Sequence, residues 1–320
     1  MYFKLEFGFG GSKRKGKEST LHHDADGWSF VKGEVGRVRA EERFKTAANY
    51  LTAARSWSEY VGHDKWSFAD MDAGAIVCYQ RWLANRGVCQ NTSSSYMRAL
   101  RVLYRRAMSD DDKTGDPFKG VFTGRKKTDK RSVSEEEIRQ LCNLSLPDGS
   151  ALAWARDIFL FGFLAMGMPF VDVAYLKKSQ LHDGFIRYAR HKTGQQIAVA
   201  VEPQMMAIIR RYENPDSEYV FPILKEGSPE DIHRQYLSSL RRYDYSLRRL
   251  SRMLSASRSL SSYVVRHSWA SIAYRHHVSL EMISKAMGHT RTSTTLIYIK
   301  GVEDNCLAET NHALISDLKL

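Results

Sequence analysis

The chain has little of what stabilises a secreted protein. Its four cysteines, Cys78, Cys89, Cys142 and Cys306, include no Cys-x-x-Cys pair. That spacing predicts reduced and mostly buried thiols rather than a disulfide framework. The first residues show no charged start followed by an apolar stretch and a small-residue cleavage site, so we expect a cytoplasmic protein.

Long apolar runs and metal-ligand patterns are absent as well. The longest uncharged stretch, Ile158 to Val171, is too short to cross a bilayer and predicts a buried core helix. Adjacent histidines at positions 22–23 and 276–277 lack the spacing of zinc ligands. We therefore expect no membrane partner, no metal and no cofactor.

Positive charge is what the chain has in excess. Its 320 residues carry 48 Lys and Arg against 36 Asp and Glu, for a net charge of +12. Such an excess favours polyanions, because basic side chains that neutralise phosphates release condensed counterions. Double-stranded DNA is the expected partner. A membrane surface or RNA are alternatives that rest on charge alone, and the aromatic block of common RNA-binding modules is not found.

Apolar periodicity divides the chain into four parts. Residues 1–36 are glycine-rich and basic and predict a flexible arm. Residues 37–112 repeat apolar side chains every three or four positions, which predicts a helical domain. Residues 113–131 mix Gly, Pro and charges like an interdomain linker. A capping box at Ser134 and Glu137 then opens a second domain, residues 132–320, which ends in a C-terminal tail.

One predicted helix of the first domain, with Asn91 as its N-cap, carries a row of arginines. No acidic residue is interleaved with them, which favours contacts with DNA phosphates over the alternative of a solvated face. A lysine pair in the predicted linker extends the basic set. The candidate DNA-binding residues are Arg98, Arg101, Arg105, Lys126 and Lys127.

The second domain contains the only segment that is typical of strands. Residues 184–201 alternate β-branched positions around Thr193-Gly194 and predict a β-hairpin. Segments at 151–166, 262–276, 279–287 and 293–299 predict helices instead. The expected fold class is therefore mainly α with a small antiparallel β-sheet.

Two C-terminal stretches resemble a known family. "YVVRHSWAS" at 263–271 precedes "ISKAMGHTRTSTTLIYIK" at 283–300, in which Tyr298 stands nine positions after His289. Together they resemble the C-terminal motifs of the tyrosine recombinase (phage integrase) family. "GMPFVDVAYLKKSQL" and "KTGQ" are similar to its Bacteroidetes-type subgroup in particular. "NTSSSYMRALRVLYRRA" resembles the family's helical core-binding domain, so the likeness covers residues 38 to 320.

The resemblance implies a C-shaped clamp on DNA, built from a helical SAM-like core-binding domain and a mixed α/β catalytic domain. It implies a site-specific DNA recombinase that cuts and rejoins strands through a covalent 3′-phosphotyrosyl intermediate, within a homotetramer on paired sites. Integration, excision and inversion share this chemistry, and the short segment before the first domain favours a simple-site enzyme such as a DNA invertase of a mobile element. Accessory DNA-bending or directionality proteins are further candidate partners, and a bacterial, nucleoid-associated location is implied.

The resemblance also assigns the chemistry to particular residues. Tyr298 is the nucleophile, and Arg266 holds the phosphate oxygens through its two-pronged guanidinium. His289 orients the phosphate by hydrogen bonding, while Lys192 protonates the departing 5′ oxygen. Tyr263 stands where the family has a histidine, and its phenol can still donate a hydrogen bond to phosphate.

A second departure from the family removes a charge. Another family arginine falls on Pro169, and neither Met168 nor Phe170 replaces it. Losing one preorganised donor costs on the order of 100–1000-fold in rate. The sequence does not reveal which arginine, if any, takes over. The alternative function is a catalytically impaired DNA-binding protein on the recombinase fold, against which the four retained catalytic residues argue.

Two assignments stay open at this point. His267 is either a structural hydrogen-bonding residue or a participant in the chemistry. The tail docks either into a neighbouring subunit or onto its own domain, through Leu307, Leu314, Ile315 and Leu318.

Overall fold

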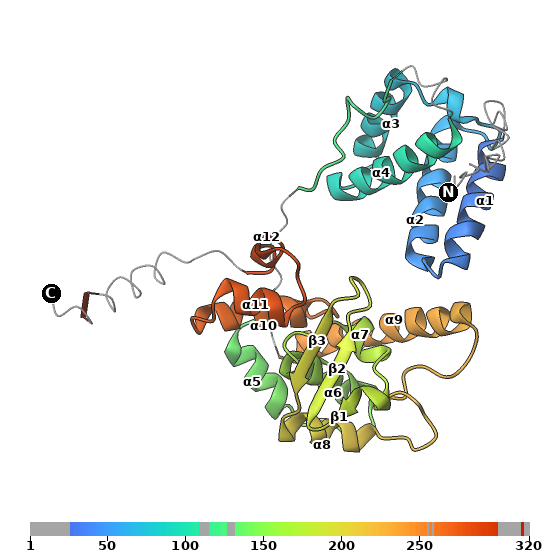
Figure 1. Ribbon diagram of the computed structural model, residues 1–320. Helices are drawn as coiled ribbons and strands as arrows, with labels where there is room; N and C mark the ends of the chain where they lie inside the picture. Colours follow the sequence, from blue (N-terminus) through green and yellow to red (C-terminus); the bar gives the residue numbers. More distant parts are fainter. Residues whose placement is uncertain are drawn as a thin grey trace, which may run out of the picture. The chain divides into compact units, whose positions relative to one another are not determined.

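The computed structural model describes residues 26–108, 115–126, 132–254, 256–257, 259–299 and 315–316. The chain divides into two units, Met1–Lys127 and Thr128–Leu320, each with its own hydrophobic core (Figure 1). Helices dominate both units, and three antiparallel strands form one sheet, so the expected fold class is confirmed. None of the described helices is long and apolar enough to span a membrane.

The first unit is a helical bundle in which α2 packs against α1, α3 and α4. Its core contains the rings of Trp57 and Tyr79, which meet edge to face at 5.2 Å. The elements are α1 (Gly27–Ala40), α2 (Phe44–Val61), the 3-10 turn η1 (Phe68–Asp70), α3 (Ala73–Asn85) and α4 (Gln90–Ala107).

Helix α1 corrects the expectation of a flexible arm over residues 1–36. Residues 27–36 are helical, because the Asp26 side chain accepts hydrogen bonds from two backbone N–H groups of the first turn. Val31 and Val35 of the same helix are buried in the core of the unit. Residues 1–25 lie outside the described part of the chain.

The predicted linker also needs correction. Residues 115–126 pack on the first unit, where Phe118 is 1% exposed. Asn91, expected as the N-cap of α4, lies inside the helix behind Cys89. Its side chain instead accepts from the backbone N–H of Lys126 at 2.8 Å and donates to the same residue's C=O at 3.0 Å. Asn91 therefore fastens this segment to α4.

The cysteines are free but not buried, contrary to expectation. Cys78, Cys89 and Cys142 are all exposed. On α3 the buried positions are Ile76, Tyr79 and Leu83, so Cys78 falls on the outer face of the helix. Cys306 lies outside the described residues.

The second unit surrounds the helix predicted near residues 151–166, which carries Arg156 and Asp157 and is uncharged from Ile158 onward. This helix, α6, packs against α5, α7, α8, α9 and α10. The helices of the second unit are α5 (Glu135–Asn143), α6 (Ala151–Leu164), α7 (Phe170–Ala174), α8 (Pro203–Tyr212), α9 (Pro229–Met253), α10 (Val264–Arg275), α11 (Leu280–Ala286) and α12 (Thr292–Leu296), with the 3-10 turn η2 (Lys178–Gln180).

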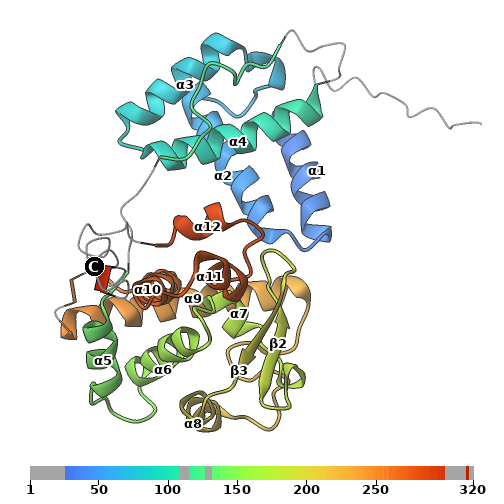
Figure 2. The same cartoon turned by 60° about the vertical axis from the view of Figure 1, so that its left-hand side comes forward.

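The predicted hairpin is present and forms two strands of the sheet. The strands are β1 (Leu181–His182), β2 (Phe185–Ala189) and β3 (Gln196–Ala200), in the order β1-β2-β3. Burial alternates along β2 and β3, and the inward positions include Ile186 and Tyr188. Both views place α11 and α12 near the end of the sheet where β2 turns into β3 (Figures 1 and 2).

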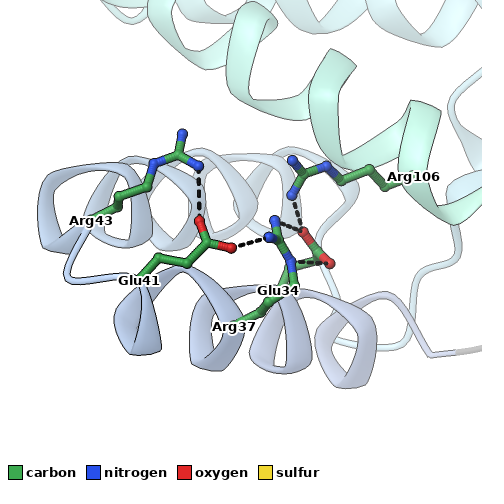
Figure 3. Close-up of polar contacts among 5 residues, drawn as sticks. All are labelled: Glu34, Arg37, Glu41, Arg43 and Arg106. Atoms are coloured by element: carbon green, nitrogen blue, oxygen red, sulfur yellow. Dashed lines mark hydrogen bonds and ion pairs between the residues drawn. The ribbon is translucent and has the colours of Figure 1, made fainter.

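An ionic network holds α1 against α4 in the first unit (Figure 3). Glu34 accepts from Arg37 at 3.1 Å on its own helix and also from Arg106 on α4. Burial opposes the charge of Glu34, but the hydrogen bonds from both arginines hold its pKa below the ordinary value. Glu41 continues the network outward to Arg43 at 3.1 Å.

Replacing Glu34 by Gln should weaken the attachment of α1. Hydrogen bonds to charged groups contribute about 1.5–3 kcal/mol each, so a loss of that order is expected. The measurement is hydrogen exchange of the α1 amides in the full chain. Arg43→Gln is the matched control, since its ion pair with Glu41 is exposed and such pairs contribute about 0–1 kcal/mol. Equal effects of the two substitutions on exchange would contradict the larger contribution expected of Glu34.

Candidate active site

Helix α10 places a buried arginine at the centre of the site. Arg266 is 1% exposed, and its guanidinium donates to the backbone C=O of Gly167 at 3.0 Å and to that of Met287. Among the described residues no carboxylate forms an ion pair with it, and its Nε has no hydrogen-bond partner. Burial lowers its pKa, yet a guanidinium stays protonated in proteins. The site therefore holds a positive charge that carbonyl dipoles orient but do not cancel.

Two glycines allow this close packing. Gly167 has a φ of 73°, and a Cβ there would lie 3.3 Å from the Cα of Arg266. Gly288 has a φ of 61°, and a Cβ there would lie 2.9 Å from Ile197 on β3. Because only glycine tolerates both the left-handed backbone and the contact, these turns bring α6, α10 and the sheet together.

His289 follows Gly288 and faces the buried arginine. Its Nε2 lies 3.2 Å from Nη2 of Arg266, and its Nδ1 lies 3.0 Å from the hydroxyl of Thr295. A guanidinium can only donate, so Nε2 accepts and Nδ1 carries the proton. Burial, followed by the charges of Arg266, Arg190 and Lys192, lowers the pKa of His289 to about 4. The imidazole is therefore neutral at physiological pH.

Tyr298 presents its hydroxyl to the same cluster. Its hydroxyl oxygen lies 2.8 Å from that of Tyr263, and its ring centroid is 5.5 Å from Cζ of Arg266. The rings of His267 and His289 pack on it at 4.7 and 5.1 Å. The expectation that Tyr298 belongs to the short helix is wrong by two residues, because α12 ends at Leu296.

The tyrosine is also a core residue. Tyr298 is 7% exposed and packs with Ala270, Ile283 and Met287. Its backbone C=O accepts from the Ser271 hydroxyl at 3.2 Å and contacts His267 Nδ1 at 3.4 Å. Apolar packing thus fixes the ring, while the hydroxyl is hydrogen-bonded to that of Tyr263. His267 contacts both the ring and the backbone of Tyr298, which is a positioning arrangement.

Lys192 lies exposed at the turn between β2 and β3. Gly194 closes this turn by donating its N–H to the C=O of Arg190 at 2.7 Å. The charge of Lys192, after burial and the charges of Arg266 and Arg190, contributes to lowering the pKa of His289. Four of the sequence-predicted residues, Tyr263, Arg266, His289 and Tyr298, are thus in contact, while Lys192 lies on the β2–β3 hairpin.

Sequence reasoning missed Arg190, a second buried arginine beside this cluster. It is 4% exposed, and its Nε lies 3.7 Å from the carboxylate of Asp172, itself 4% exposed. The alternation of β2 contains the signal that would have found it. Ile186 and Tyr188 point inward, so the next inward position is residue 190.

The three candidate DNA-binding arginines of the first unit have protein partners. Arg101 and Arg105 both donate to Asp116, so the row has an acidic partner in the fold although no acidic residue is interleaved with it in the sequence. Arg98 donates to the C=O of Thr123 at 3.4 Å, and Lys126 is exposed. Lys127 lies outside the described residues.

Comparisons with known proteins agree with this arrangement. Residues 131–303 match the phage integrase family, and residues 28–127 match the phage integrase SAM-like domain. The chain belongs to the phage integrase family. The tyrosine recombinase family and the function of a site-specific DNA recombinase, both expected from the sequence, are confirmed.

Curated relatives that match this integrase family member over most of their length are tyrosine recombinases. Tyrosine recombinase XerD of Rhizobium meliloti (strain 1021) is 25% identical over 269 residues, which cover 78% of this chain and 83% of the relative. Tyrosine recombinase XerD of Caulobacter vibrioides (strain ATCC 19089 / CIP 103742 / CB 15) is 23% identical over 294 residues, covering 88% and 93%.

Solved structures of integrases share the fold. A lambda integrase dimer bound to a COC' core site has a TM-score of 0.62 at 15% identity, covering 86% of this chain and 98% of that chain. The Tn1549 transposon integrase in complex with transposon right end DNA has a TM-score of 0.60 at 11% identity, covering 92% and 100%.

The neutral state of His289 predicts a pH-dependent stability. Between pH 6.5 and about 4 the unfolded chain protonates this histidine while the folded chain does not, so stability falls as the pH falls. The free energy of unfolding should therefore drop less over this interval in His289→Gln than in the wild type. Denaturant titrations at several pH values measure it, and parallel curves for the two proteins would contradict the neutral assignment.

Proposed function

We propose that Tyr298 attacks a DNA phosphodiester and that Lys192, Tyr263, Arg266 and His289 assist it. One observation carries the proposal. Arg266 is buried with no carboxylate bonded to it among the described residues, and the Tyr298 ring centroid lies 5.5 Å from its Cζ. A site built only for stability would pair that guanidinium with a carboxylate.

The chemistry follows from the charges in the cluster. The Tyr298 oxygen forms a bond to phosphorus and releases its proton to water, while the bond from phosphorus to the 5′ oxygen breaks and Lys192 protonates that oxygen. Arg266 neutralises the charge that grows on the non-bridging oxygens. The covalent 3′-phosphotyrosyl bond stores the energy for rejoining, so rejoining needs no nucleotide.

Tyr263 acts as a neutral donor in this scheme. Partial burial, then its hydrogen bond with Tyr298, raises the pKa of Tyr263 to about 12. A phenol with this pKa keeps its proton at neutral pH and can donate to Tyr298 or to a phosphate oxygen. It thereby serves in the place of the histidine that the family has at this position.

Duplex DNA is the substrate we propose, bound by several copies of the chain. The integrase structures with this fold include a dimer on a core site and a tetramer on a Holliday junction. We infer a homotetramer on paired sites, with Arg98, Arg101 and Arg105 on DNA phosphates. Accessory DNA-bending or directionality proteins remain candidate partners, and inversion is the rearrangement we favour.

The alternative, a catalytically impaired DNA-binding protein, is not favoured. The proline at position 169 is its main support. A protein without the chemistry would have no need of a buried cation beside the tyrosine ring, yet Arg266, His289 and Tyr298 are packed together. The adduct experiment below separates the two functions.

Covalent capture tests the nucleophile directly. The full chain is incubated with a pool of duplexes that have randomised arms. A nick in each duplex prevents the cut strand from being rejoined, and covalent adducts are then separated under denaturing conditions. We expect the wild type to form an adduct and Tyr298→Phe to form none, because the phenylalanine ring preserves the packing without the oxygen.

Tyr274→Phe, which removes another phenol from the same hydrophobic cluster, is the matched control and should react like the wild type. Duplex binding by Tyr298→Phe should be unchanged. Binding without any adduct across the whole wild-type pool would support the impaired protein instead.

The arginine row makes a separate prediction about affinity. Each phosphate contact contributes about 0.9 to the slope of log affinity against log salt. Arg98→Ala and Arg105→Ala should therefore weaken binding to non-specific duplex and lower that slope by about 1 each. Fluorescence anisotropy over a salt series measures it. Arg43→Ala, whose guanidinium is bonded to Glu41, should leave the slope unchanged. An unchanged slope in all three would assign the row to structure.

A further inference from the structure

We propose that Arg190 is the second phosphate-binding arginine of the active site and that Asp172 positions it, in compensation for the proline at position 169. The inference rests on the function proposed above and concerns the same phosphate. The established family supplies this charge from the position of Pro169, whereas here the guanidinium comes from a β-hairpin.

The backbone of the hairpin fixes where Arg190 points. Its N–H donates to the C=O of Gln195 at 2.8 Å, and its own C=O accepts from Thr193 and Gly194. These bonds hold residue 190 at the inward position that follows Ile186 and Tyr188. A Cβ added at Gly288 would lie 3.3 Å from Cδ of Arg190, so the side chain runs beside the loop that presents His289.

The ion pair that accompanies the burial of Arg190 is long and has no hydrogen bond. A buried cation is normally bonded to its counter-ion, because desolvation otherwise costs more than the pair gains. Here Nε of Arg190 and Oδ2 of Asp172 lie 3.7 Å apart, and in the described part of the chain neither atom has a hydrogen-bond partner. The guanidinium therefore lies near the carboxylate, and its Nε can still donate a hydrogen bond.

The charges around the cluster favour an anion. Arg190 and Arg266 are both buried, and the charge of Arg190 adds to burial in lowering the pKa of Arg266. Both cations lower the pKa of His289. One nearby carboxylate, Asp172, opposes them. Two guanidiniums and one carboxylate leave a net positive site, which a phosphodiester anion would neutralise through charge-assisted hydrogen bonds.

Asp172 links this arginine to the position of the missing one. It lies on α7, which begins directly after Pro169, and its N–H donates to the C=O of Pro169 at 2.9 Å. Its carboxylate accepts the N–H of His191 at 3.0 Å. Asp172 therefore fixes the turn between Arg190 and Lys192, so that one hairpin carries both cations to the site.

The first test compares adduct formation on the captured nicked substrate. Arg190→Ala and Arg190→Gln should slow it on the order of 100–1000-fold, the cost of one preorganised charge donor. Arg187→Ala is the matched control, since Arg187 is exposed on the outward face of β2 and stacks on Phe185. It should react like the wild type. Equal rates for wild type and both Arg190 variants would overturn the inference while leaving Tyr298 as the nucleophile.

A substrate with an uncharged methylphosphonate at the cleavage position provides a readout that misfolding cannot mimic. If Arg190 neutralises a non-bridging oxygen, the Arg190→Ala defect should shrink at least tenfold on this substrate relative to the ordinary phosphodiester. Lys192→Ala should keep its defect, because it acts on the leaving oxygen. The ratio of rates within one variant does not depend on how much protein is folded. An unchanged ratio for Arg190→Ala would refute a phosphate contact.

A transplanted guanidinium tests the compensation. Pro169→Arg should restore adduct formation in Arg190→Ala and have little effect in the wild type, where the charge is already present. Failure to restore adduct formation would show that an arginine at position 169 and Arg190 do not bind the same phosphate oxygen, which would contradict the compensation. Asp172→Asn should also slow the reaction, and the methylphosphonate should relieve that defect in part, which a purely structural carboxylate would not show. A wild type that forms no adduct would instead defeat the function on which this inference rests.

Discussion

The arrangement of the site depends on a guanidinium that is buried without a bonded carboxylate. Arg266 is held by the backbone C=O groups of Gly167 and Met287 and by a neutral imidazole. Carbonyl dipoles orient a cation and leave its charge available, whereas a bonded carboxylate would neutralise it. The left-handed turn at Gly167 and the turn before His289 exist at the places where those carbonyls are needed. Much of the local fold around α10 therefore serves to hold the Arg266 guanidinium away from water without a bonded carboxylate.

The proposed nucleophile, Tyr298, is positioned by apolar packing. The Tyr298 ring fills a small apolar cluster between α10 and α11, and two imidazoles pack on it. Its neighbours Leu296 and Ile297 are exposed. Packing fixes the ring without engaging its oxygen, which contacts only another phenol among the described residues. A tyrosine can thus be a core residue and a reagent at once, because its two ends meet different surroundings.

Much of this could be predicted from the sequence, and the failures have physical reasons. The spacing of Arg266, His289 and Tyr298 identified the cluster, since the motif lies on consecutive short helices. Helix α1 was missed because three glycines, Gly27, Gly33 and Gly36, weaken the helical pattern, while packing against α2 and the Glu34–Arg106 bridge stabilise it. Pairing of the arginine row with Asp116 was missed because it needs the chain to turn back after α4. No local pattern records a contact of that kind.

Arg190 shows why a missing motif residue is weak evidence for lost activity. Transition-state stabilisation depends on where a preorganised charge lies, and is indifferent to which segment carries it. A side chain on α7 and a side chain on the β2–β3 hairpin can serve the same oxygen if their ends converge. The hairpin origin has a consequence of its own, since Arg190 and Lys192 then move together and Asp172 restrains both. Displacing this hairpin would remove the oxygen-binding charge and the proton donor in one motion, whereas in the family pattern those two groups sit on separate elements.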